Sequence, residues 1–146
     1  MNNAILLRTV SVGILLITEG IRDIRKNEVG IIMPVLNALA AIVFIFVFKD
    51  MGIPGVLIAL AEGIFVIILS FLTKEGIGLG DGIILCSTGL MLGWKNNLIM
   101  IFIACFISAF VSVLLMIFMK ADKKTKIPFV PFMIPAFLVT IIIRMT

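Results

Sequence analysis

Residues 76–94 read GIGLGDGIILCSTGLMLGW, and this stretch decides the fold. Its first residues belong to a predicted polar loop, residues 73–80, and residues 82–94 form a short apolar run. Four of the seven residues 76–82 are glycine, and Asp81 stands where the loop enters the apolar run. The stretch therefore predicts a carboxylate held at a membrane boundary by a glycine-rich segment.

The rest of the chain is strongly apolar. Of its 146 residues, 62% are hydrophobic and 14% are charged, and the mean hydropathy is +1.32. A soluble domain carries about 25% charged residues. The composition therefore predicts a polytopic membrane protein in contact with the lipid bilayer.

Six apolar runs are separated by short polar breaks. A helix needs about 20 residues to cross about 30 Å of hydrocarbon, and five of the runs approach this length. The runs are residues 4–21, 29–48, 53–72, 82–94, 98–119 and 127–145. They predict an all-α protein with six transmembrane helices. No linker, low-complexity stretch or repeat divides them, so we expect one membrane-embedded domain over residues 1–146.

Lysines and arginines predict the orientation. With six spans, loops one, three and five share a side and carry eight of the 12 basic residues. The eight are Arg22, Arg25, Lys26, Lys74, Lys120, Lys123, Lys124 and Lys126, and the other four are Arg8, Lys49, Lys95 and Arg144. Basic loops stay in the cytoplasm, so we expect a multi-pass protein of the inner or plasma membrane with both termini outside. The anionic leaflet accounts for the net charge of +4, and no nucleic-acid partner is predicted.

Residue types that are missing narrow the chemistry. The chain has no histidine and no tyrosine, which excludes Ser-His catalysis and His-based zinc proteases. Cys86 and Cys105 cannot complete a four-ligand zinc shell, and Ser87 and Ser108 are predicted far from Lys95. No metal or organic cofactor is predicted, and carboxylates remain as the reactive groups.

Asp81 has two possible roles. An aspartate at the start of a helix commonly caps it, but a cap does not require so many glycines. Glycines allow positive φ and let an extended peptide lie against the backbone, which favours a catalytic Asp81 beside a loop that positions the substrate. The glycines assigned to this loop are Gly76, Gly78 and Gly80.

Asp23 is the second candidate carboxylate. It is either a solvated acid among Arg22, Arg25 and Lys26 or the partner of Asp81 on the same membrane face. Glu19 lies one turn earlier on the same helix face, where it would tune Asp23 by like-charge repulsion or reach the surface.

Three segments resemble signatures of the type IV prepilin peptidases, in family order and at family-like spacing. Residues 76–94 resemble the Gly-x-Gly-Asp segment of this family, including its Gly-Trp end at Gly93 and Trp94. The sequence DIR from Asp23 resembles the first signature, and residues 127–132, IPFVPF, resemble the third. The residues of the third, a structural motif, are Pro128, Phe129, Pro131 and Phe132.

The resemblance implies an intramembrane aspartyl endopeptidase with Asp23 and Asp81 as catalytic residues. Its substrate would be a prepilin or pseudopilin, cleaved after its leader peptide at the cytoplasmic membrane face. The chain resembles the short, stand-alone form without the N-terminal methyltransferase region. It departs from the family at residues 29–31, where Val-Gly-Ile replaces Ile-Pro-Asn, and at Ile83, where the family has lysine. These departures concern substrate preference.

Two alternatives stay open. Glu62 lies in the middle of an apolar run, and an intramembrane carboxylate is a functional candidate by default. It would be the ion site of a small ion-coupled carrier, or it is simply bonded to a neighbouring helix. A catalytically inactive assembly scaffold of the same fold is the other alternative. The sequence leaves the oligomeric state open.

Overall fold

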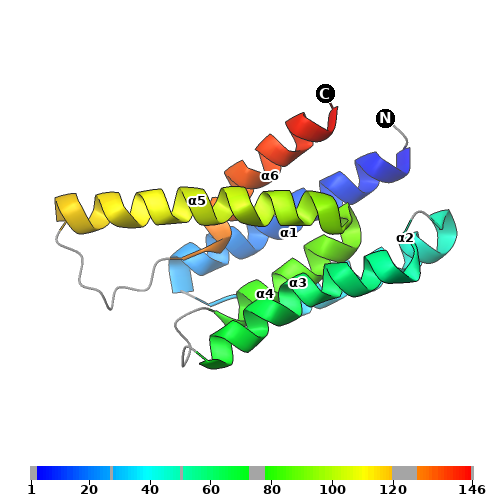
Figure 1. Ribbon diagram of the computed structural model, residues 1–146, viewed down its shortest axis with the longest axis horizontal. Coiled ribbons are helices and arrows are strands. Elements are labelled where there is room, and N and C mark those ends of the chain that lie inside the picture. Colours follow the sequence, from blue (N-terminus) through cyan, green and yellow to red (C-terminus); the bar gives the residue numbers. More distant parts are fainter. Residues whose placement is uncertain (1–2, 27, 50, 73–77, 120–127, 146) are drawn as a thin grey trace.

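The computed structural model describes residues 3–26, 28–49, 51–72, 78–119 and 128–145, in which every regular element is an α-helix (Figure 1). The helices are α1 (Asn3–Lys26), α2 (Ile32–Phe48), α3 (Ile53–Leu72), α4 (Leu79–Leu92), α5 (Trp94–Met119) and α6 (Val130–Met145). The predicted all-α fold is confirmed.

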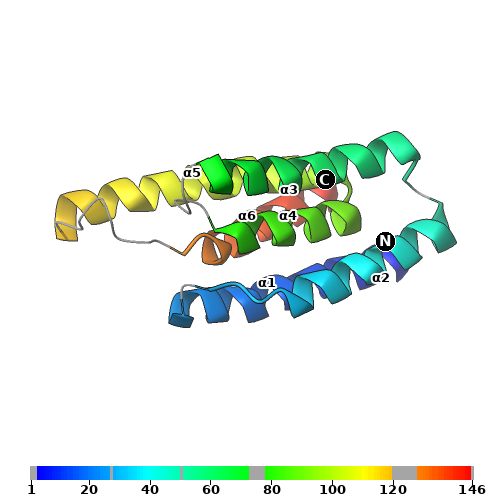
Figure 2. The same cartoon turned by 90° about the horizontal axis from the view of Figure 1, so that it is seen from below.

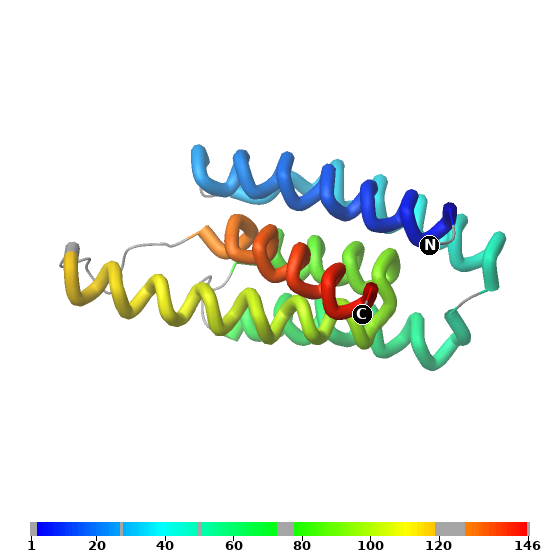
Figure 3. The backbone as a smooth tube through the Cα atoms, turned by 90° about the horizontal axis from the view of Figure 1, so that it is seen from above, coloured from blue at the N-terminus to red at the C-terminus, as the bar shows by residue number. Residues whose placement is uncertain are grey.

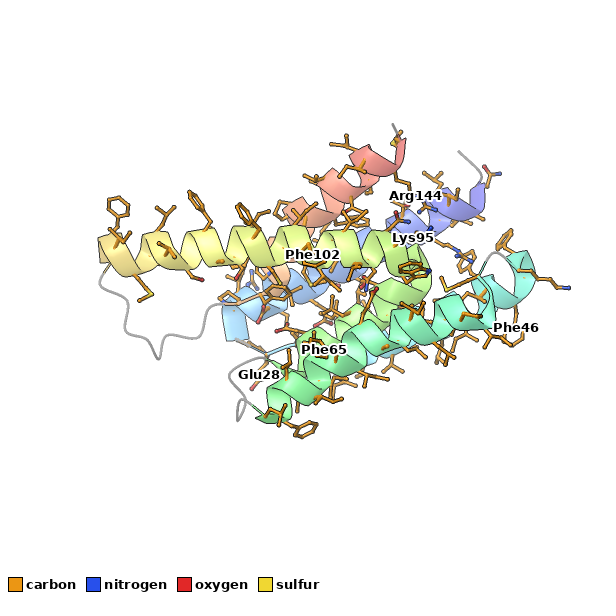
Figure 4. All side chains as sticks on the ribbon, in the orientation of Figure 1. Glu28, Phe46, Phe65, Lys95, Phe102 and Arg144 are labelled. Atoms are coloured by element: carbon orange, nitrogen blue, oxygen red, sulfur yellow. The ribbon has the colours of Figure 1, made fainter. Side chains whose placement is uncertain are left out.

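The apolar surface identifies the protein as a multi-pass membrane protein. Helices α1, α3 and α5 are long and apolar enough to cross a bilayer, and α2, α4 and α6 are shorter apolar helices. Large side chains such as Phe46, Phe65 and Phe102 come from three different helices and are exposed (Figure 4). A contiguous apolar exterior of this kind is stable in lipid rather than in water.

The helices form three layers (Figures 2 and 3). One layer contains α1 and α2, the middle one α4 and α6, and the third α3 and α5. Helix α4 packs against α1, α2, α3 and α5, and ten of its 14 residues are buried. Both termini lie at one end of the bundle, and α5 extends beyond the other helices at the opposite end (Figure 1). The chain thus starts and finishes on the same side.

Small residues bring α3 and α4 into direct backbone contact. A Cβ atom added to Gly63 would lie 2.5 Å from the Cys86 nitrogen and 2.5 Å from the Gly82 oxygen, and one added to Gly89 would lie 2.9 Å from the Ala59 oxygen. Close approach through small residues drives helix association in lipid, where the hydrophobic effect between helices is absent. This contact fixes the helix that carries Asp81.

Several helix boundaries differ from the prediction. Residues 95–97, predicted as a loop, belong to α5, and the break between α4 and α5 is Gly93 alone, with φ 85°. Only glycine adopts this conformation readily. Helix α1 also continues to Lys26 and α4 begins at Leu79, so both candidate aspartates lie within helices rather than loops.

Candidate active site

Asp23 lies near the end of α1 and is only 6% exposed. The backbone N–H of Val130 donates to its Oδ2 at 3.1 Å between nitrogen and oxygen. This N–H group belongs to the first turn of α6, where a helix has no internal acceptors for its N–H groups. Asp23 is therefore a buried carboxylate at the start of α6 and not a solvated member of the basic cluster.

Asp81 lies in the first turn of α4 and is 7% exposed. Its carboxylate accepts a hydrogen bond from the backbone N–H of Gly78, the residue before the helix. An acid at this position that bonds back to the preceding N–H stabilises a helix start. The capping role considered for Asp81 is thus present, together with a burial that a simple surface cap does not need.

The fold brings Asp23 and Asp81 together. Helices α1 and α4 are in contact, and the two carboxyl groups interact electrostatically. Both lie at the end of the bundle opposite the termini, because α1 ends and α4 begins there (Figure 1). Two buried carboxyl groups that interact in this way disfavour the ionisation of both at once.

The predicted glycine loop is only partly described. Gly76 lies outside the described residues. Gly78 has φ −66° and ψ 129°, and Gly80 belongs to α4, so the expected positive φ is absent at both positions. The expected close approach is present at Gly80, where an added Cβ would overlap the side chain of Val29.

Residues 28–31 lie against α1 at Gly30 and against the start of α4 at Val29. The backbone N–H of Gly30 donates to Glu19 Oε2 at 2.6 Å, and Glu19 is only 2% exposed. A side chain at Gly30 would collide with Arg22 and Glu19. Glu19 therefore holds this segment in place by its bond to Gly30. The neighbouring Val29 then packs against Gly80. The place of Glu19 one turn before Asp23 was the only sequence signal for this role.

The third signature forms the start of α6. The N–H of Phe132 bonds the oxygen of Phe129 at 3.0 Å, and Pro131 occupies the first turn, where a missing N–H does no harm. Pro128 precedes this turn and is half-buried. Residue 127 lies outside the described residues. The motif thus presents the backbone N–H of Val130 to Asp23.

Glu62 belongs to a polar network in the bundle interior. Asn97 is fully buried and donates from Nδ2 to Glu62 Oε2 at 2.6 Å and to the Leu85 oxygen at 3.2 Å. Its Oδ1 accepts from the Thr88 hydroxyl at 2.7 Å. The reading of Glu62 as a carboxyl bonded to a neighbouring helix agrees with these contacts.

A second interior network lies on the other side of α4. Asn37 donates from Nδ2 to the Ser87 hydroxyl at 2.9 Å and accepts from the Ser11 hydroxyl. It joins α1, α2 and α4. A bond from Glu62 to a neighbouring helix was one of the two predicted alternatives, but the asparagines of the two networks were not predicted, although an asparagine in or beside an apolar run signals a hydrogen-bonded partner. Within the described part of the chain, no three His, Cys, Asp or Glu side chains could hold a metal ion.

Comparison with known proteins agrees with the resemblance of the first two segments, and the third, residues 127–132, lies outside the matched range. The sequence description of the type IV leader peptidase family matches residues 10–113, which include Asp23 and Asp81. The chain belongs to the type IV leader peptidase family. Searches of curated proteins and of solved structures give no significant match. The protein is therefore a membrane peptidase.

Proposed function

We propose that the protein is an aspartyl endopeptidase that removes the leader peptide of prepilins or pseudopilins. The observation that supports this most is the pairing of two buried carboxyl groups, Asp23 from α1 and Asp81 from α4, which interact electrostatically at one end of the bundle. Two such groups activate water and polarise a scissile carbonyl without a metal or organic cofactor.

The position of the pair suits a substrate with a membrane helix. A prepilin leader is short and basic and precedes an apolar helix, so its scissile bond lies where the helix leaves the membrane. Arg22, Arg25 and Lys26 lie near the end of α1 and are exposed, and basic residues at a helix end favour the cytoplasmic side. These charges support the proposal that the site faces the cytoplasm and that both termini lie outside.

The test is cleavage by the purified protein. Candidate prepilins from neighbouring genes are incubated with the protein in detergent, and mass spectrometry identifies the new N-terminus. Asp23→Asn and Asp81→Asn keep the side-chain shape and remove the ionisable group, so we expect monodisperse variants without detectable cleavage. Glu28→Gln, an exposed acid near the same end, is the matched control and should retain activity. Cleavage by either aspartate variant at the wild-type rate would remove that residue from the pair.

The orientation is tested by labelling in intact cells. Single cysteines replace Lys26 at the end of α1 or Lys95 at the start of α5, in a chain whose Cys86 and Cys105 are changed to alanine. An impermeant reagent should label position 95 in intact cells and position 26 only after lysis. The opposite pattern would place the site outside the cytoplasm.

A further inference from the structure

A cavity of about 320 Å³ lies at the end of the bundle that holds both termini, between α1, α6 and the corner where α4 meets α5. Phe137 and Thr140 line it and are only 5% and 3% exposed, so the cavity reaches into the bundle. Its volume falls in the range of about 300–1,000 Å³ that is typical of ligand sites. The aspartate pair lies at the opposite end, so this cavity is separate from the candidate active site.

Four polar side chains line the cavity, namely Thr9, Asn96, Thr140 and Arg144. The two threonine hydroxyls each donate to a carbonyl one turn earlier, at 2.8 Å, and their oxygens can still accept a hydrogen bond. Asn96 Nδ2 donates one N–H to a carbonyl at the end of α4, at 2.9 Å, and its second N–H can donate to a ligand. The cavity therefore offers donors and a positive charge to an anion, and acceptors to a hydroxyl group.

The electrostatic surroundings of the cavity favour an anionic ligand. Among the described residues near this end, the charged side chains are all basic, and they are Arg8, Lys49, Lys95 and Arg144. Asp50 lies outside the described residues, and none of the described acids lines the cavity. Arg144 also stands in the last turn of α6, near the ends of α1 and α5 (Figure 4). Its guanidinium is thus available to a ligand rather than paired with a described acid.

We propose that this cavity binds the headgroup of an anionic phospholipid such as phosphatidylglycerol, in the leaflet opposite the aspartate pair. Arg144 and Asn96 donate to the phosphate, and the oxygens of Thr9 and Thr140 accept from the glycerol hydroxyls. A guanidinium pairs with phosphate through two parallel hydrogen bonds, and basic pockets between transmembrane helices recognise anionic headgroups.

The apolar rim of the cavity indicates a lipid rather than a soluble phosphate. Met145 lines the cavity and is exposed, and so are Leu138 and Ile143 on the same helix. Acyl chains of a lipid whose headgroup enters the cavity would therefore lie along α6. Such a lipid contacts α1, α5 and α6 together and would stabilise their packing, because it binds only the folded bundle.

The test is lipid binding by the purified protein in detergent, measured by native mass spectrometry. We expect phosphatidylglycerol to bind about tenfold more tightly than phosphatidylcholine with the same acyl chains. Arg144→Gln should remove this preference. Lys49→Gln is the matched control, because Lys49 is a cation at the same end but outside the cavity, and it should keep the preference. Equal binding of the two lipids by the wild type, or equal losses in the two variants, would overturn the proposal.

A second pair of variants separates the shape of the cavity from its charge. Ile5→Trp places an indole in the cavity and leaves every charge in place, so it should weaken phosphatidylglycerol binding, whereas Arg144→Lys should retain part of it. Circular dichroism checks that both variants are folded. Wild-type binding by Ile5→Trp would place the lipid elsewhere. Complete displacement of the lipid by excess glycerol phosphate would assign the site to a soluble phosphate and also refute the proposal. None of these outcomes depends on cleavage of a prepilin.

Discussion

At the end of the bundle that holds Asp23 and Asp81, buried carboxylates accept hydrogen bonds from backbone N–H groups, whereas in the interior polar side chains bond one another across helices. Asp23 bonds Val130 and Glu19 bonds Gly30, in each case a residue of another chain segment. The interior networks around Asn37 and Asn97 link helices that the chain connects only indirectly. The difference indicates that the first region is built to position groups and the second to hold the bundle together.

The largest expected effect concerns the contact of α3 with α4. Gly63→Ala places a Cβ 2.5 Å from the Cys86 nitrogen, so the two helices must separate, and we expect a loss of about 3 kcal/mol of unfolding free energy. Denaturation by SDS, followed by circular dichroism, measures it. Gly13→Ala is the control, because its Cβ would meet Phe137 at an ordinary 3.6 Å. Equal stability of the two variants would show that the backbone contact does not hold α4.

The next effect concerns the site itself. Gly80→Ala puts a Cβ into the side chain of Val29, which should displace residues 28–31 or the first turn of α4. We expect about a hundredfold loss of leader cleavage, equivalent to about 2.7 kcal/mol, with a smaller change in stability. Combining it with Val29→Gly removes the overlap and should restore most of the activity. No recovery in the double variant would mean that Gly80 serves the reaction in another way.

A moderate loss of stability is expected when the interior network around Asn97 is broken. Asn97→Leu removes the donor to Glu62 and the acceptor of Thr88, and leaving buried polar groups unbonded costs about 1–3 kcal/mol. Stability in SDS titration should fall while cleavage by the folded protein changes little. Asn96→Leu loses the bond from Asn96 Nδ2 to the oxygen of Leu92, four residues earlier at the end of α4, and should be milder. If the folded Asn97→Leu variant lost cleavage activity while its stability stayed unchanged, the interior network would serve the reaction, and the distinction between a positioning region and a stabilising region would not hold.

The smallest effect is expected at Glu19. Glu19→Gln keeps a side-chain oxygen that accepts from the Gly30 N–H, whereas Glu19→Leu leaves this N–H without its acceptor. We expect about a tenfold loss of cleavage in the leucine variant, equivalent to about 1.4 kcal/mol, and a two- to threefold loss at most in the glutamine variant. Equal losses would indicate that the charge of Glu19, rather than its anchoring of residues 28–31, matters for the reaction.

Hydropathy and local motifs predicted much of this arrangement. The six helices follow from runs of apolar residues, and the family follows from three short segments, because both signals are local in the sequence. The partners of the carboxylates were not predictable in this way. Asp23 and Val130 are 107 residues apart and Asn37 and Ser87 are 50 apart, and a hydrogen bond over such a separation depends on the packing of the whole bundle.

The break at Gly93 is a second feature that the local sequence did not predict. Lys95 and Asn97 read as a polar loop, but a single glycine with φ 85° reverses the chain, and Asn97 finds its bonds within the bundle. Likewise, the glycines beside Asp81 were expected to adopt positive φ, whereas Gly80 is required for space. The sequence shows the positions of the glycines, but the packing around each one decides whether it is needed for its backbone conformation, as at Gly93, or for space, as at Gly80.

The shortness of α4 has a consequence for its depth in the membrane. Its 14 residues rise about 21 Å, whereas the hydrocarbon of a typical bilayer is about 30 Å thick. Because α4 packs against α1, α2, α3 and α5 and is mostly buried, the bilayer does not adapt to its length, and at least one of its ends lies at the depth of the hydrocarbon. For the proposed hydrolysis, the helices around α4, and not the thickness of the bilayer, then decide how water reaches Asp81.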